Sequence, residues 1–159
     1  MSNYRDAVGL MVINREKRVF LGYRAWSQNS PYHWQMPQGG IDEGETPEQS
    51  AWRELYEETG MTPEHTKILA VSQNWYTYDL PDKFHKTIDG ERQKWFLMYF
   101  YGTNENINLH VQRKPEFIRF RWNRLKTAPY LVIPFKKQVY CDVLKEFRPI
   151  IKEFNPDEV

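Results

Sequence analysis

The sequence GGIDEGETPEQSAWRELYEETGM, which covers Gly39–Met61, decides the fold of this chain. Thr46 is a good N-cap, Pro47 suits the first helical position, and Gln49 completes a Thr-x-x-Gln capping box. Gly60 supplies the matching stop, because glycine readily adopts the left-handed conformation common at helix C-termini. The stretch therefore predicts a glycine-rich loop followed by a helix with well-defined ends.

Three carboxylates of this helix lie on one face. At about 100° per residue, Glu54, Glu57 and Glu58 fall within an arc of roughly 100°. A solvated acidic face is the ordinary alternative, but such helices interleave Lys or Arg four residues from Glu, and here Arg53 is the sole cation beside four glutamates. Carboxylates near a helix C-terminus are also opposed by the helix dipole. The cluster therefore favours a hard divalent cation and a reaction on a phosphate chain.

The composition of the whole chain limits the classes of protein. Its 159 residues predict one domain spanning 1–159, long enough to bury a substantial core. The 22 basic and 21 acidic residues nearly balance, so binding of a polyanion must depend on local basic groups. The single Cys141 excludes an intramolecular disulfide and a cysteine-rich zinc site. Without a signal peptide or an apolar run of about 20 residues, we expect a cytoplasmic protein with no membrane partner.

Apolar runs outside the helix predict a mixed sheet. Ala7–Ile13 is typical of a strand buried on both faces, and Arg18–Tyr23 is expected to return from it as a hairpin. Polar residues predict an exposed loop over 79–92, and apolar spacing predicts an amphipathic helix within 135–154. The further strands expected are 67–73, 95–101 and 117–122. The chain is therefore assigned to the α/β class, with helices flanking the sheet.

The spacing of the opening stretch resembles the Nudix box at every specified position. Gly39 is followed after five residues by Glu45, and after seven more by Arg-Glu-Leu-x-Glu-Glu-x-Gly-Met at 53–61. The resemblance to the Nudix hydrolase family implies an α/β/α sandwich with a mixed β-sheet, in which the box forms a loop–helix–loop metal site. It also implies Mg²⁺ or Mn²⁺ as cofactor, with more than one ion bound.

The same resemblance implies roles within the box. Glu54, Glu57 and Glu58 match the family's metal ligands, whereas Arg53 and Glu45 match a pair that braces the loop against the helix. Glu54, Glu57 and Arg53 are accordingly the expected catalytic residues, with Glu54 or Glu57 as the general base. The members of the box expected to be structural are Gly39, Glu45 and Gly60.

Hydrolysis of a pyrophosphate linkage suits these side chains. Water attacks phosphorus and expels a phosphate, while divalent ions neutralise phosphate oxygens and lower the pKa of bound water. Carboxylates can hold the ions and accept the proton of the water. The box therefore predicts the bond that is cleaved, and residues outside the box must determine the substrate.

Segments outside the box resemble the bacterial RNA pyrophosphohydrolases, a subgroup that also contains dinucleoside polyphosphate hydrolases. The segments are YRDAVG (4–9), WQMPQGGI (34–41), NWYTYDLP (74–81), QKWFLMYF (93–100), PEF (115–117) and PFKKQVY (134–140). The implied reaction removes pyrophosphate from the 5′ end of triphosphorylated RNA, leaving a monophosphate that marks the transcript for decay. The alternatives are hydrolysis of diadenosine tetra- or pentaphosphate and, in a different class, a non-catalytic module that binds nucleotides or RNA.

The resembling segments contain candidate substrate contacts. Guanidinium and ammonium groups are usual partners of phosphate oxygens, and aromatic rings can stack on a base near the 5′ end. Without the resemblance, each cation would be read as surface charge and the ring of residue 135 as core. Glu116 matches a position that completes the metal shell in the family. The expected phosphate contacts are Arg5, Arg24, Lys94 and Lys136, and the expected stacking residues are Tyr78 and Phe135.

Several positions depart from the pattern of the subgroup. Glu91 and Arg92 replace the Gln and the small or basic residue that the subgroup favours, and His33 replaces a small polar residue before Trp34. The loop over 79–92 is also shorter than in the enterobacterial form. These changes lie near the expected entrance of the substrate-binding site. They therefore affect the expected preference for substrate chain length more than the expected reaction. A stimulating accessory protein is a further partner compatible with the sequence.

Overall fold

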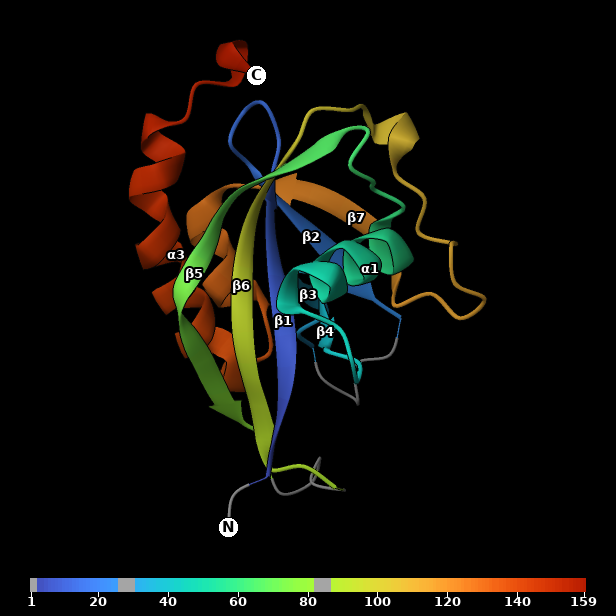
Figure 1. The fold of residues 1–159 in the computed structure, drawn as a ribbon, viewed down its shortest axis with the longest axis vertical. Helices are drawn as coiled ribbons and strands as arrows, with labels where there is room; N and C mark the ends of the chain where they lie inside the picture. Colours follow the sequence, from blue (N-terminus) through green and yellow to red (C-terminus); the bar gives the residue numbers. More distant parts are fainter. Residues whose placement is uncertain (1–2, 26–30, 82–86) are drawn as a thin grey trace.

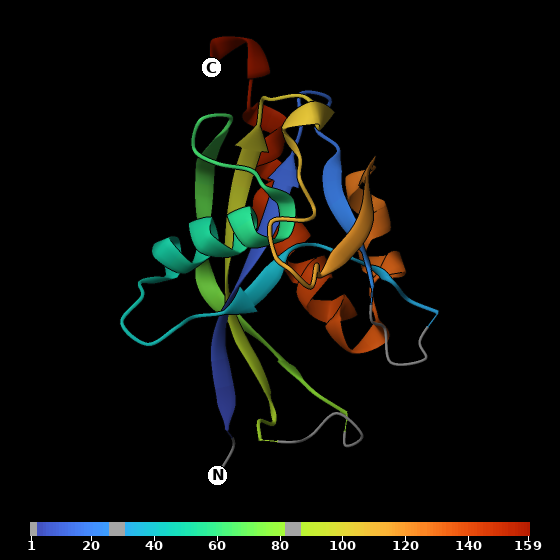
Figure 2. The same ribbon diagram turned by 90° about the vertical axis from the view of Figure 1, so that its right-hand side faces the viewer.

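Three layers make up the computed structural model, which describes residues 3–25, 31–81 and 87–159. Helix α1 (Pro47–Thr59) covers one face of a central sheet, and helix α3 (Lys137–Glu153) covers the other (Figure 1). The view turned by 90° shows the two helices on opposite sides of the strands (Figure 2). The structure therefore confirms the α/β/α sandwich expected from the sequence.

The central sheet is mixed, as predicted. Within the described residues it contains seven strands: β1 (Tyr4–Ile13), β2 (Val19–Arg24), β3 (Trp34–Gln35), β4 (Gln38–Gly40), β5 (Thr66–Asp79), β6 (Gly90–Phe100) and β7 (Phe117–Asn123). Its main path runs β3–β2–β1–β6–β5, while β4 pairs with β1 and β7 pairs with β2. Only the pairing of β1 with β6 is parallel among these neighbours. That pairing brings Arg5 opposite Glu91, 86 residues along the chain.

Alternation along β1 divides the core into two hydrophobic clusters, because successive side chains of a strand point to opposite faces. Val8 and Leu10 pack in the cluster that contains Leu55 of α1. Met11 and Ile13 pack in the cluster that contains the buried side of α3. Both faces of the strand are thus covered, which explains the nearly continuous apolar run in the sequence.

The ends of α1 follow from the capping residues recognised in the sequence. The Thr46 hydroxyl accepts the Gln49 N–H at 3.1 Å, and the Gln49 side-chain oxygen accepts the Thr46 N–H at 2.9 Å. At the other end Gly60 has φ of 74°, and its N–H donates to the Tyr56 carbonyl at 2.9 Å. The predicted helix is therefore confirmed at both ends.

The remaining elements differ from the sequence predictions mainly in length. The hairpin is present, with Ile13 of β1 paired to Val19 of β2, and α3 lies within the predicted 135–154. The loop predicted over 79–92 is wrong at 79, which ends β5, and at 90–92, which belong to β6, and Glu91 is buried rather than exposed. Residues 82–86 of that loop lie outside the described part of the chain. The short strands β3 and β4 have no clear signal in the sequence.

The last elements bring the C-terminal third of the chain back to the sheet. The short helix α2 (Ala128–Leu131) precedes a 3₁₀ turn at Pro134–Lys136, which leads directly into α3. Across the residues that the structure describes, each helix is too short or too polar to cross a membrane.

Candidate active site

Arg53 links the glycine-rich loop to the carboxylates of α1. Its Nε donates to Glu45 at 2.7 Å, and its Nη2 donates to the Gly40 carbonyl at 2.9 Å. Its Nη1 donates to Glu54 at 2.8 Å and to Glu57 at 3.2 Å. The hydrogen bonds from Arg53, followed by one from the Ser50 hydroxyl, lower the pKa of Glu45 to about 2. One guanidinium therefore holds the loop and two of the predicted metal ligands together.

Glu54 and Glu58 are carboxylates in low-dielectric surroundings. Burial raises the pKa of Glu54 to about 7, against the opposing effect of Arg53. Glu58 is only 4% exposed and accepts the Gln38 N–H at 3.1 Å. Its pKa is raised by burial first, and then by the nearby charges of Glu54 and Glu116. Buried carboxylates that repel each other are stabilised when a cation joins them.

Gly39 permits the close approach of β4 to this cluster. A Cβ atom at position 39 would lie 2.1 Å from the Glu54 carboxyl carbon, so only glycine leaves room for the carboxylate. Gly60 ends the helix two residues after Glu58. Both glycines of the box thus have a local steric or conformational reason.

The donor set suits a divalent cation, although its side chains do not form a ready ligand cage. In the described part of the chain, no three His, Cys, Asp or Glu side chains converge closely enough to hold an ion. Arg53 binds two of the carboxylates instead. Glutamate oxygens are nevertheless the ligands that Mg²⁺ and Mn²⁺ prefer, and the mutual repulsion at Glu58 would be relieved by a positive charge.

Cations approach the carboxylates from the start of α3 and from the end of β2. Lys136 is 5% exposed and donates to the Gln35 side-chain oxygen at 3.0 Å. Burial, followed by the positive charge of Arg24, lowers the pKa of Lys136 to about 8, and three nearby glutamates, Glu91, Glu116 and Glu58, oppose that effect. Arg24 donates to Glu116 at 3.1 Å. Lys136, Arg24 and Glu116 therefore lie in the electrostatic neighbourhood of Glu58, although they are distant in sequence.

A buried polar network centred on Glu91 adjoins the glycine-rich loop. Arg5 forms an ion pair with Glu91, and the Tyr78 hydroxyl donates to the same carboxylate at 2.8 Å. The side-chain amides of Gln38 and Gln93 donate to it at 3.3 and 3.2 Å. Arg5 also lies within 3.2 Å of the space that a Cβ at residue 40 would occupy. Glu91 thus orients Arg5 beside the box.

Sequence reasoning treated Glu91 as a departure from the subgroup and missed its central place in this network. A signal was present in the spacing of Glu91, Gln93 and Trp95, which puts all three on one face of a strand. Trp95 donates to the Gln93 side chain at 3.0 Å, which extends the same network into the core. The Gln38 side-chain oxygen is buried and lacks a hydrogen-bond partner in the described structure.

The structure places the predicted aromatic contacts together but not as an open platform. Tyr78 and Phe135 have ring centroids 5.6 Å apart, and Lys136 lies 5.6 Å from the Tyr78 ring. Tyr78 is 7% exposed, so its own ring has little surface for stacking. Phe135 is more accessible and is the better surface for a base. Stacking of Tyr78 on a base therefore stays a prediction, which the burial of its ring disfavours.

Lys94 lies apart from the other predicted phosphate contacts. Lys94 directly follows Gln93 in β6, so its side chain points to the face of the sheet opposite that of Glu91 and Gln93. Its Nζ donates to the Gln73 carbonyl at 3.2 Å and lies 5.6 Å from the Trp75 ring. The structure therefore does not bring Lys94 together with Arg5, and its contacts are with β5.

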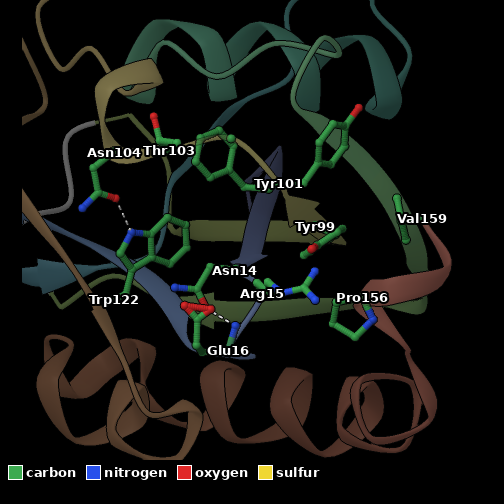
Figure 3. A pocket seen from close by; sticks show the side chains of 12 residues that line it. Asn14, Arg15, Glu16, Tyr99, Tyr101, Thr103, Asn104, Trp122, Pro156 and Val159 are labelled. Atoms are coloured by element: carbon green, nitrogen blue, oxygen red, sulfur yellow. Dashed lines mark hydrogen bonds between the residues drawn. The ribbon is translucent and has the colours of Figure 1, made fainter.

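A separate cavity of about 600 Å³ lies at the far end of the sheet (Figure 3). Asn14, Tyr99 and Trp122 are among its lining residues, and no residue of the box lines it. Asn14 follows the last residue of β1, about 30 Å along an extended strand from Arg5. This cavity is therefore distinct from the carboxylate cluster, and its size gives no evidence for catalysis.

Comparison with known proteins agrees with this geometry. The NUDIX domain family matches residues 3–143. The chain belongs to the Nudix hydrolase family, whose members generally use divalent metal ions.

Individual relatives are similar over nearly their whole length. The RNA pyrophosphohydrolase of Wolbachia sp. subsp. Brugia malayi (strain TRS) is 44% identical over 154 residues, which cover 94% of this chain and 92% of that protein. The RNA pyrophosphohydrolase of Cereibacter sphaeroides (strain KD131) is 43% identical over 92% of this chain and 91% of that protein. A C. elegans Ap4A hydrolase in a binary complex is 20% identical with a TM-score of 0.67, covering 94% of this chain and 99% of that chain, and shows the shared fold.

Proposed function

We propose that this protein is an RNA pyrophosphohydrolase, which removes pyrophosphate from triphosphorylated 5′ ends and leaves a 5′-monophosphate. The observation that carries the proposal is that Arg5 lies beside Gly40 of the glycine-rich loop, while the buried charges of Lys136 and Glu58 influence each other. Such a site can hold a phosphate chain beside groups that activate water. The identity to RNA pyrophosphohydrolases from two bacteria supports RNA as the substrate.

The residues of the box fit a divalent cofactor, for which we propose Mg²⁺ or Mn²⁺ with more than one ion. Glu54, Glu57 and Glu58 would hold the ions, with Glu116 beside them. The bound cofactor supplies charge neutralisation for the phosphate oxygens and a lower pKa for the attacking water. Glu116 is suited to this part because its charge already influences Glu58.

The side chains of the protein position the substrate and move the proton. Glu54 or Glu57 accepts the proton of the water that attacks phosphorus, while the P–O bond to the departing pyrophosphate breaks. Arg5, Arg24 and Lys136 bind the phosphate oxygens of the 5′ end. Phe135 stacks on a base near that end.

A comparison of two substrates tests the choice of RNA. A short triphosphorylated RNA and diadenosine tetraphosphate would be hydrolysed in parallel with Mg²⁺, and kcat/KM measured for each. We expect the RNA to have the higher kcat/KM. Diadenosine polyphosphates are the second candidate, because they present a similar phosphate chain and a base to the same residues. A large advantage for the dinucleotide would reject the RNA assignment.

Replacement of Glu57 by Gln separates an enzyme from a module that only binds. Glu57→Gln keeps the shape of the side chain but removes its charge, so we expect kcat to fall by about a hundredfold or more. Glu48→Gln is the matched control, because Glu48 is exposed on the same helix near its other end. Substantial turnover by the Glu57 variant would contradict the proposed metal site.

The proposed substrate also implies a location and partners. Triphosphorylated transcripts occur where transcription occurs, so we infer that the protein acts in the cytoplasm of a bacterial cell. An accessory protein that stimulates turnover is compatible with this activity.

A further inference from the structure

The exposed side of α3 carries a basic stripe. Lys137, Lys145, Arg148 and Lys152 are all exposed, and at about 100° per residue they occupy an arc of roughly 80°. The buried residues of α3, from Val139 to Ile151, occupy a separate arc of roughly 140° on the same count. The stripe is therefore the solvent face of a helix that is well anchored in the core.

The acidic residues of α3 lie next to this stripe, since Asp142 and Glu146 line a cavity together with Lys145, and Glu153 lines another with Lys152. Asp142, Glu146 and Glu153 fall between roughly 140° and 180° from Lys137, outside the arc of the stripe. Glu146 is already engaged, since it accepts the Gln73 N–H at 2.9 Å. An ordinary solvated helix would interleave opposite charges at a spacing of four residues. The arc of the stripe nevertheless contains no carboxylate of α3, which indicates a surface for an anionic partner.

Basic residues from other elements widen the stripe. A cavity of about 720 Å³ beside α3 is lined by Lys126, Tyr130 and Cys141 together with Lys145, Arg148 and Lys152. A neighbouring cavity of about 600 Å³ shares three of these basic residues and adds Lys17, Arg18 and Arg124. Acidic residues in the two linings are limited to Glu16 and Glu153. The local surface is thus strongly positive although the net charge of the chain is only +1.

The cations of the stripe are available to a ligand. Within the described residues, Lys145, Arg148 and Lys152 form no ion pair with a carboxylate. Tyr130 lies beside them with 69% of its surface exposed, and the Lys137 ammonium lies 4.4 Å from its ring. Exposed aromatic rings among cations are the usual components of surfaces that bind single-stranded nucleic acid.

We propose that this basic stripe binds the phosphodiester backbone of the RNA downstream of its 5′ end, an inference that rests on the proposed function. Lys137 directly follows Lys136 of the candidate active site, and the stripe continues from there for about 22 Å along α3. A strand whose 5′ phosphates lie near Lys136 can therefore pass from Lys137 over the exposed Tyr130 ring to Lys145, Arg148 and Lys152. The contacts are to backbone phosphates, so they favour longer unpaired RNA without reading its sequence.

An acidic protein is the competing occupant of the same surface. RNA is favoured because the stripe begins at the site where the 5′ end is processed and contains an exposed aromatic ring. A protein partner would not require that continuity. The two occupants also differ in a measurable property, since contacts to single-stranded RNA give a salt dependence of about 0.7 per phosphate.

The triple variant Lys145→Ala/Arg148→Ala/Lys152→Ala tests the proposal. Binding of an unpaired 5′-hydroxyl RNA of about 20 nucleotides would be measured by fluorescence anisotropy over a range of salt concentrations. The slope of log Kd against log salt should fall by about 2 relative to the unmodified protein. Arg148→Ala alone should lower it by about 0.7, whereas Lys67→Ala, at an exposed position on β5, should not change it.

Turnover of a triphosphorylated RNA of about 3 nucleotides supplies the second measurement, because so short a strand does not reach the three mutated cations. We expect the triple variant to hydrolyse it like the unmodified protein, which also shows that the variant is folded. Equal slopes and affinities for all variants would overturn the proposal and leave an acidic protein as the occupant. If the unmodified protein binds the long RNA but does not hydrolyse the triphosphorylated RNA, the proposed function fails while the binding surface stands.

Discussion

Lys136 is a buried cation that should reduce the stability of the protein. Its Nζ donates to Gln35 at 3.0 Å, and the nearby carboxylates do not overcome the effect of burial, so its pKa falls from 10.5 to about 8. That difference corresponds to about 3 kcal/mol of free energy against the charged form in the folded state. We therefore predict that Lys136→Met raises the free energy of unfolding near neutral pH.

The magnitude of this gain is limited by the hydrogen bond that is lost. Without the lysine, the Gln35 side-chain oxygen is left unsatisfied, at a cost of about 1–3 kcal/mol. The net gain at pH 7 should therefore be about 1 kcal/mol. The same substitution should lower kcat/KM for triphosphorylated RNA by at least about tenfold, because the proposed phosphate contact is removed.

The pH dependence gives the sharper test. A lysine with a lowered folded-state pKa destabilises the protein fully below about pH 8, and this cost disappears as the pH rises from about 8 to 10.5. Urea unfolding of both proteins at several pH values would measure the difference in their free energies of unfolding. We expect the difference to shift by about 3 kcal/mol toward the unmodified protein over that range. A difference that stays constant from pH 7 to pH 11 would refute this reasoning.

Two further predictions concern the ends of the box. Gly60→Ala should lower the free energy of unfolding by about 1–3 kcal/mol, as measured by urea unfolding. The reason is that φ is 74° at this position and that the new Cβ would lie 2.8 Å from the Asn108 backbone nitrogen. Gly44→Ala, also at positive φ but in open space, should cost less, and an equal cost would show that the contact is unimportant. Since Arg53 lowers the pKa of Glu45 to about 2, the stability that Glu45 contributes is present above about pH 4.5 and is lost as the pH falls toward 2. Glu45→Gln should therefore be less stable than the unmodified protein at pH 7 and should approach it near pH 2.

Local signals account for the parts of the fold that the sequence predicts well. The helix at Pro47–Thr59 depends on Thr46, Gln49 and Gly60, which act on backbone groups a few residues away. Strand β1 could be predicted because the sequence contains an apolar run long enough to be buried on both faces. Such features can be recognised without knowing which distant segments become neighbours.

The environment of Glu91 could not be predicted in the same way. Its burial depends on the parallel register of β1 and β6, which pairs it with Arg5 across the sheet. In the sequence it stands among polar residues and resembles part of an exposed loop. Lys136 shows the same limit, because the sequence predicts a phosphate contact but not that its charge is buried. Burial of a charged residue is decided by non-local packing, which composition and spacing do not record.

The guanidinium groups of the candidate site already have carboxylate partners. Arg53 binds Glu54 and Glu57, Arg5 binds Glu91, and Arg24 binds Glu116. A phosphate chain alone would meet guanidinium groups that already have partners, and a divalent cation alone would compete with Arg53. Glu54 and Glu57 would be free to hold a divalent cation if the phosphates of a substrate took the Arg53 guanidinium, so that few charges would be left uncompensated. The ion pairs of the free protein, rather than the net charge of the chain, explain how this site tolerates its partly buried charges.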